Sequence, residues 1–134
     1  MSRLFALAAL LAVPAFAADE PKENALITKL KGLKVKGPFT LLVTLKLKDG
    51  QSKAFFDLAK PAVEATRKEK GCIAYDPQHS AEDPNKIIFY ERWKNVEALA
   101  AHLDAPHTKK LLAGIGDLLD GTPTLEFYQL PEER

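Results

Sequence analysis

Alternation of apolar and polar side chains predicts that Phe39 to Lys48 forms a β-strand with one covered face. Phe39, Leu41, Val43, Leu45 and Leu47 fall on one side of the predicted strand, and Thr40, Leu42, Thr44, Lys46 and Lys48 fall on the other. Because the second side becomes charged toward its end, we expect an antiparallel sheet with one face covered and one face open.

Helical periodicity replaces this alternation from Ser52 to Lys70. The apolar stripe there comprises Phe55, Ala59, Ala62, Val63 and Thr66. Ser52 is a suitable N-cap, and Gly71 is expected to be the C-terminal cap. A second helical region begins after Asn95, which is expected to cap it, with Val96, Leu99, Ala100 and Leu103 facing inward. Pro106 interrupts this region, and helical character resumes from Thr108 to Leu119.

Three further strands complete the pattern. Cys72 to His79 and Ile87 to Trp93 flank a turn that contains Asp83-Pro84, which predicts a hairpin, and Thr124 to Leu130 is the last strand. The resulting order, β-α-β-β-α-β, is that of a ferredoxin-like α+β sandwich. Its helices cover one face of the sheet, so the other face is left for water, a partner sheet or a ligand.

The N-terminal region is predicted to lie outside this domain. Residues 1–17 have the pattern of a secretory signal peptide: Arg3, an apolar run and the small-x-small sequence Ala15-Phe16-Ala17. We therefore expect an exported protein, periplasmic or secreted. Residues 18–37 form a lysine-rich extension with a short amphipathic helix near Glu23 to Lys31, residues 38–130 form the domain, and residues 131–134 form a polar tail.

Composition narrows the class of protein. The formal net charge of the chain is +1, which argues against a nucleic-acid partner. The apolar run near the N-terminus is shorter than the roughly 20 residues of a membrane span, and no transmembrane segment is predicted. Cys72 is the only cysteine, so no internal disulfide can form, and we expect it to be a small buried hydrophobe rather than a reactive thiol.

Short motifs in the second half of the chain carry a family resemblance. They are Gly71-Cys72-x-x-Tyr75, Asp83-Pro84, Glu91-x-Trp93, Ala98-Leu99-x-x-His102 and Pro106-His107. In this order they resemble the antibiotic biosynthesis monooxygenase family, in particular its quinol-monooxygenase-like branch. The resemblance spans Pro38 to Leu130. It implies a homodimeric α+β barrel and, for some members, oxidation of quinols or polyphenols by dioxygen without metal or flavin.

A haem-degrading branch of the same superfamily uses an Asn on the first strand, a Trp on the second helix and a His further along. In this chain the first strand contains no Asn, His102 stands where that Trp would align, and Leu112 lies near that His position. We therefore predict neither haem nor any other cofactor.

A cofactor-free oxygenase needs a base that deprotonates a phenol, a dry pocket and hydrogen-bond donors for the developing oxyanion. His102, at the edge of the apolar stripe of its helix, is the predicted catalytic base, although a hydrogen-bonded structural role fits its position equally well. Trp93, Tyr75 and His107 are the predicted substrate-binding residues, with a packing role as the alternative for Trp93 and a structural role as the alternative for His107.

The other polar residues of interest are expected to have structural roles or to lie at the surface. His102 and His107 are the only His pair at metal-ligand spacing, and only Asp104 lies near them in sequence, so no metal site is predicted. His79 and Arg67 are expected at the surface. Glu91 shares a strand face with Trp93, and the family resemblance implies a structural role in which Glu91 ties a helix to the sheet.

Besides a structural or stress-associated dimer with a filled barrel, these expectations leave two functions open. The first is an exported, cofactor-independent monooxygenase-like protein that oxidises a small aromatic quinol or polyphenol with dioxygen. The alternative is a non-catalytic dimeric binding module for a small apolar or aromatic ligand.

Overall fold

The computed structural model describes residues 23–132, so the predicted signal peptide lies outside the described residues. The elements along the chain are α1 (Ala25–Gly32), β1 (Phe39–Lys46), α2 (Ser52–Thr66), β2 (Cys72–His79), β3 (Lys86–Trp93), α3 (Val96–Asp104), α4 (Pro106–Ile115), the 3-10 turn η1 (Gly116–Leu118) and β4 (Thr124–Tyr128). No helix within this range is long and apolar enough to cross a membrane.

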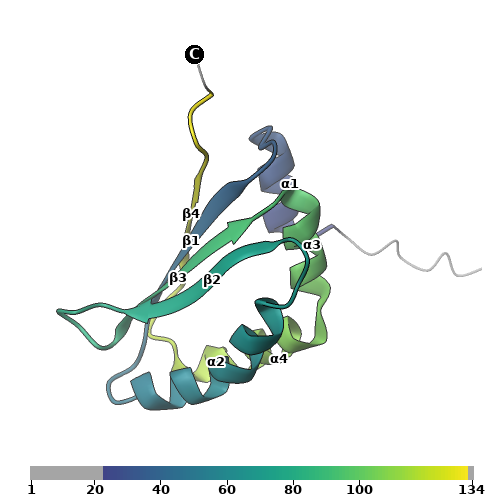
Figure 1. Cartoon of the computed structure of the whole chain (residues 1–134). Coiled ribbons are helices and arrows are strands. Elements are labelled where there is room, and N and C mark those ends of the chain that lie inside the picture. Colours follow the sequence, from purple (N-terminus) through teal and green to yellow (C-terminus); the bar gives the residue numbers. More distant parts are fainter. Residues whose placement is uncertain (1–22, 133–134) are drawn as a thin grey trace, which may run out of the picture.

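The strands form one antiparallel sheet in the order β2-β3-β1-β4, and Figure 1 shows the helices on one side of it. The predicted ferredoxin-like α+β fold is confirmed. The apolar side of β1 faces the helices, because Phe39, Leu41 and Leu45 are almost fully buried. Register places Phe39 opposite Trp93 and Leu41 opposite Glu91, so β1 and β3 present one continuous inner surface.

The first long helix ends earlier than predicted. All five predicted stripe residues of α2 are buried, but the helix ends at Thr66 rather than at Lys70, and Arg67 is its C-cap. Gly71 is therefore not a helix cap. It starts the approach to β2, and a Cβ at this position would clash with the Cβ of Ala98 on α3. The glycine is required by the close approach of backbone to helix.

Smaller differences occur at the other element ends. Pro106 does not merely interrupt a helix but begins α4, because a proline at the first position of a helix sacrifices no helical hydrogen bond. The last turn before Leu119 is the 3-10 turn η1, and β4 ends at Tyr128. The N-terminal helix begins at Ala25, where the Asn24 side chain accepts a hydrogen bond from the Leu26 amide.

Candidate functional site

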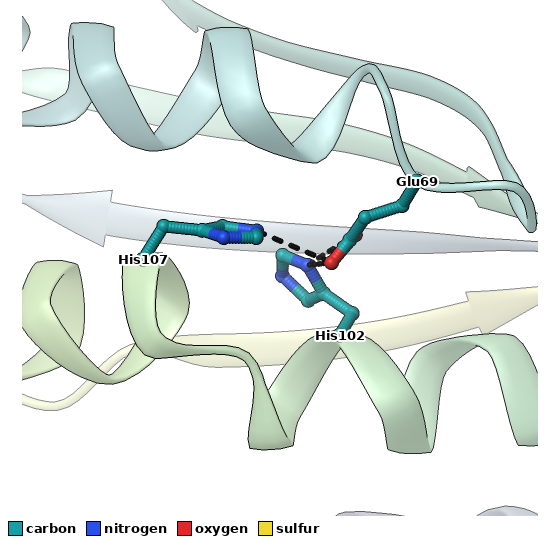
Figure 2. A group of neighbouring side chains, drawn as sticks. All are labelled: Glu69, His102 and His107. Carbon is teal, nitrogen blue, oxygen red and sulfur yellow. Dashed lines mark hydrogen bonds and ion pairs between the residues drawn. The ribbon is translucent and has the colours of Figure 1, made fainter.

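Three side chains from separate segments converge beneath the sheet: Glu69, His102 and His107 (Figure 2). The Nδ1 atom of His102 lies 2.9 Å from Glu69 Oε2. The Nε2 atom of His107 lies 3.2 Å from Glu69 Oε1. One carboxylate therefore accepts hydrogen bonds from both imidazoles.

Local backbone geometry places each of these residues. Glu69 lies in the turns between α2 and β2, where its amide donates to the carbonyl of Thr66 and its carbonyl accepts from the amide of Cys72. His102 is in the last turn of α3. The extended backbone at Ala105 then lets α4 start in a new direction, which brings the second residue of α4, His107, back toward the carboxylate.

The environment of His102 fixes its protonation. The residue is only 3% exposed. Burial lowers the pKa of His102, and the Glu69 carboxylate only partly offsets this effect. The ring is therefore neutral at pH 7. Since the carboxylate can only accept, Nδ1 carries the proton and Nε2 keeps a free lone pair. Among the described residues, the hydrogen bonds of this ring involve Nδ1 alone.

Aromatic side chains of the sheet enclose the other side of the imidazole. The ring centroid of His102 is 4.6 Å from that of Trp93 and 5.2 Å from that of Tyr75. Burial raises the pKa of Tyr75, and the negative charge of the nearby Glu91 carboxyl raises it further. The Tyr75 phenol therefore stays protonated and remains a hydrogen-bond donor. Trp93 is fully buried and packs against the helices.

Glu91 is a buried carboxyl without a cationic partner among residues 23–132. Its Oε2 accepts a hydrogen bond of 2.8 Å from Trp93 Nε1. Burial raises the pKa of Glu91 to about 7, against the lowering effect of this hydrogen bond. Glu91 was expected to tie a helix to the sheet, but its hydrogen bond instead joins two residues of the same strand.

A cavity of about 400 Å³ lies between the sheet and helices α3 and α4. Its polar lining within the domain consists of Tyr75, Glu91, His102 and Thr108. The rest is largely apolar and includes Leu41, Val43, Phe89, Leu99, Leu111 and Ile115. This volume is within the range of about 300–1,000 Å³ typical of small-molecule sites. A hollow of about 410 Å³ over α2 and Pro77 touches neither His102 nor Glu91.

The structure separates the predicted site residues into two groups. His102 and Tyr75 line the cavity, whereas Trp93 stands behind its lining, and His107 borders a smaller hollow beside Asp57 and Lys110. Substrate binding by Trp93 and His107 stays a prediction. His79 and Arg67 are exposed, as predicted. Burial raises the pKa of the partly buried Cys72 thiol to about 11, which keeps it protonated and agrees with an unreactive thiol.

The sequence analysis missed Glu69. The helix was extended to Lys70, which left Glu69 as one more helical side chain, and Asp104 was the only carboxylate considered near the two histidines. Asp104 instead pairs with Lys109, at 3.4 Å. The ligand atoms of Glu69, His102 and His107 lie within 4.8 Å of one another, so the cluster has the donor set of a zinc site. The expectation that Asp104 is the only carboxylate near the two histidines was wrong.

Fold and cavity together define a ferredoxin-like α+β domain with a ligand-sized space beneath its sheet. The chain belongs to the antibiotic biosynthesis monooxygenase family, whose model matches residues 38–113.

The chain is also similar to individual proteins and solved structures. An uncharacterized protein of Synechocystis sp. is 29% identical over 95 residues, which cover 71% of this chain and 65%, just under two thirds, of that protein. The probable quinol monooxygenase YgiN of Escherichia coli K12 is 28% identical over 92 residues, covering 60% of this chain and 88% of YgiN. The solved structure of Rv0793 from Mycobacterium tuberculosis matches with a TM-score of 0.65 and 25% identity, covering 72% of this chain and 97% of Rv0793. A Caulobacter crescentus structure shares the fold, with a TM-score of 0.71 and 21% identity over 78% of this chain and 99% of that one.

Proposed function

We propose that this protein oxidises a small aromatic quinol or polyphenol with dioxygen, without metal or organic cofactor, and that His102 is the catalytic base. The observation that carries the proposal is a buried, neutral imidazole that lines an apolar cavity and whose Nδ1 is held by Glu69. The similarity to a probable quinol monooxygenase supports the same class of substrate.

The chemistry begins with proton transfer from a substrate hydroxyl to Nε2 of His102. The resulting phenolate is electron-rich enough to reduce dioxygen, and a carbon–oxygen bond then forms to give a ring hydroperoxide. Loss of water cleaves the oxygen–oxygen bond and leaves a hydroxyquinone. Overall, a quinol and dioxygen give a hydroxyquinone and water: the substrate loses four electrons, one oxygen atom is inserted and the other is reduced to water.

The surrounding residues have distinct roles in this proposal. Glu69 is a positioning residue that holds the Nδ1 proton and stabilises the imidazolium formed during proton transfer. The Tyr75 phenol donates to the developing oxyanion from the cavity wall. The apolar lining excludes water from the reacting anion. Beyond the predicted contacts with substrate, Trp93 packs against His102 and His107 shares the Glu69 carboxylate.

The same proposal includes assembly and location. The open sheet face presents large side chains, with Tyr128 51% and Tyr90 36% exposed, and we propose that two copies pair through this face. Export by the N-terminal segment is also part of the proposal. Recovery of a mature chain that begins near Ala18 outside the cytoplasm would test it.

Dioxygen uptake by chelator-treated protein with a panel of quinols and polyphenols tests the activity. We expect uptake above the autoxidation rate, a loss of at least about 100-fold in His102→Ala, in line with the usual contribution of a general base, and no loss in the exposed control His79→Ala. Equal rates in wild type and His102→Ala would refute the assigned base. Ligand binding without any uptake would favour the binding-module function.

A further inference from the structure

The helix α1 lies outside the residues matched by the family but is firmly docked on the domain, beside α3 (Figure 1). Its Ile27 and Leu30 side chains belong to the hydrophobic core. The amide of Val35 donates to the carbonyl of Leu30, and the Gln129 side chain donates to the carbonyl of Lys36 at 2.8 Å. The segment is therefore fixed at the helix and again where the chain enters β1.

The start of α1 reaches the same cavity as His102. Asn24 and Leu26 line it together with Leu103 of α3 and Leu125 of β4. His102 and Glu91 are almost fully buried, whereas Asn24 and Leu125 are exposed. The histidine and the carboxyl thus form the inner end of the cavity, and the α1 residues lie at its rim.

The side chains that line the cavity disfavour ligands that carry a negative charge. The residues that line the cavity include no lysine or arginine, and Glu91 contributes a carboxyl that is negative once ionised. A ligand with its own carboxylate would lose its hydration without gaining an ionic partner, which is costly in an apolar site. The hydroxyl groups of a neutral aromatic ring can form hydrogen bonds with His102, Tyr75 and the Asn24 amide.

We propose that the cavity is selective for neutral aromatic hydroxy compounds over their anionic analogues, and that Leu26 of α1 supplies an apolar wall at its rim that such a ring contacts. This inference deepens the proposed function and rests on it for the location of the ligand. It makes the N-terminal helix part of the binding site.

Calorimetric binding of two matched probes to the chain lacking residues 1–17 tests both parts. One probe is 2-naphthol and the other is 6-hydroxy-2-naphthoate, which adds a carboxylate to the same ring. We expect the neutral probe to bind at least about 10-fold more tightly. Leu26→Ala is expected to weaken 2-naphthol binding by about 10-fold, at the lower end of the effect of an apolar pocket contact, and Leu26→Met is expected to restore most of it. Leu33→Ala is the control, because Leu33 is the C-cap residue of the same helix but is 56% exposed and outside the cavity.

The outcomes distinguish the selectivity of the cavity and the role of α1 from the proposed monooxygenase activity. Equal affinities for the two probes would overturn the charge selectivity, and unchanged 2-naphthol affinity in Leu26→Ala would overturn the role of α1. Selective binding of 2-naphthol without dioxygen uptake from any quinol or polyphenol of the panel would support this inference and refute the proposed monooxygenase activity. Absence of 2-naphthol binding to the wild-type chain would overturn both parts of this inference, whereas dioxygen uptake with the quinol panel would still support the proposed function.

Discussion

The buried Glu91 carboxyl makes the stability of the protein depend on pH in a direction that the structure fixes. Burial raises the pKa of Glu91 from 4.5 to about 7. A group whose pKa is higher in the folded state stabilises that state when protonated. Its contribution is therefore fully present below pH 4.5 and is lost as the pH rises to about 7.

The substitution Glu91→Gln isolates this effect. Glutamine is neutral at every pH, and its amide oxygen can still accept the hydrogen bond from Trp93 Nε1. Each pKa unit corresponds to about 1.36 kcal/mol. The raised pKa of Glu91 thus predicts that the free energy of unfolding of the variant, relative to that of wild type, increases by about 3 kcal/mol between pH 4.5 and pH 8. Other titrating groups are common to both proteins and cancel in the difference.

Urea unfolding at several pH values and one fixed protein concentration measures this difference. The fluorescence of Trp93, the only tryptophan, reports the transition next to the substituted residue. Glu64→Gln on the exposed side of α2 is the control, for which the difference should stay within about 0.5 kcal/mol at every pH. If the stability difference between Glu91→Gln and wild type did not change with pH, the Glu91 carboxyl would titrate alike in the folded and unfolded chains, and burial would not raise its pKa.

Three further predictions concern packing and assembly. Gly71→Ala should destabilise the fold by about 1–3 kcal/mol through the clash with Ala98. The control Gly116→Ala, at a helical position with open space around it, should be neutral or stabilising by up to about 1 kcal/mol. Equal urea unfolding midpoints for the two variants would contradict this prediction. Thr66→Val should stabilise by about 1 kcal/mol, because the buried Thr66 hydroxyl has no hydrogen-bond partner among the described residues; a lower thermal midpoint would show that the hydroxyl is paired. Tyr90→Lys on the open sheet face should shift the sedimentation of the chain from dimer toward monomer, and a monomeric wild type would refute the proposed pairing.

Local patterns were sufficient to predict most of the fold. The inward stripe of α2, the limits of β2 and the Asn95 cap of α3 all follow from periodicity and capping chemistry, and the structure agrees with them. Such patterns do not specify where a helix stops when no residue breaks it. The stretch from Arg67 to Lys70 has good helix formers, and the close packing of Gly71 against α3 overrides their propensity.

The site was predicted less completely, because the end of α2 and the turn that follows it were not predicted. His102 and Tyr75 were identified because each lies within a short motif that carries the family resemblance, whereas Glu69 lies outside these motifs. Glu69 reaches His102 across 33 positions, through a turn that periodicity predicted to be helix. The part played by α1 in the cavity depends on its docking against α3, a tertiary contact that its own short apolar stripe does not encode.

The proposed chemistry requires that Glu69 hold His102 as a neutral imidazole with the proton on Nδ1 and a free lone pair on Nε2. Long-range proton–nitrogen NMR spectra of the three histidines at pH 7, with the His102 signals assigned by their loss in His102→Ala, measure this state directly. We expect a neutral His102 ring protonated at Nδ1, and loss of that preference in Glu69→Leu, whose side chain offers no acceptor. A doubly protonated His102, or a neutral ring with its proton on Nε2, would contradict it.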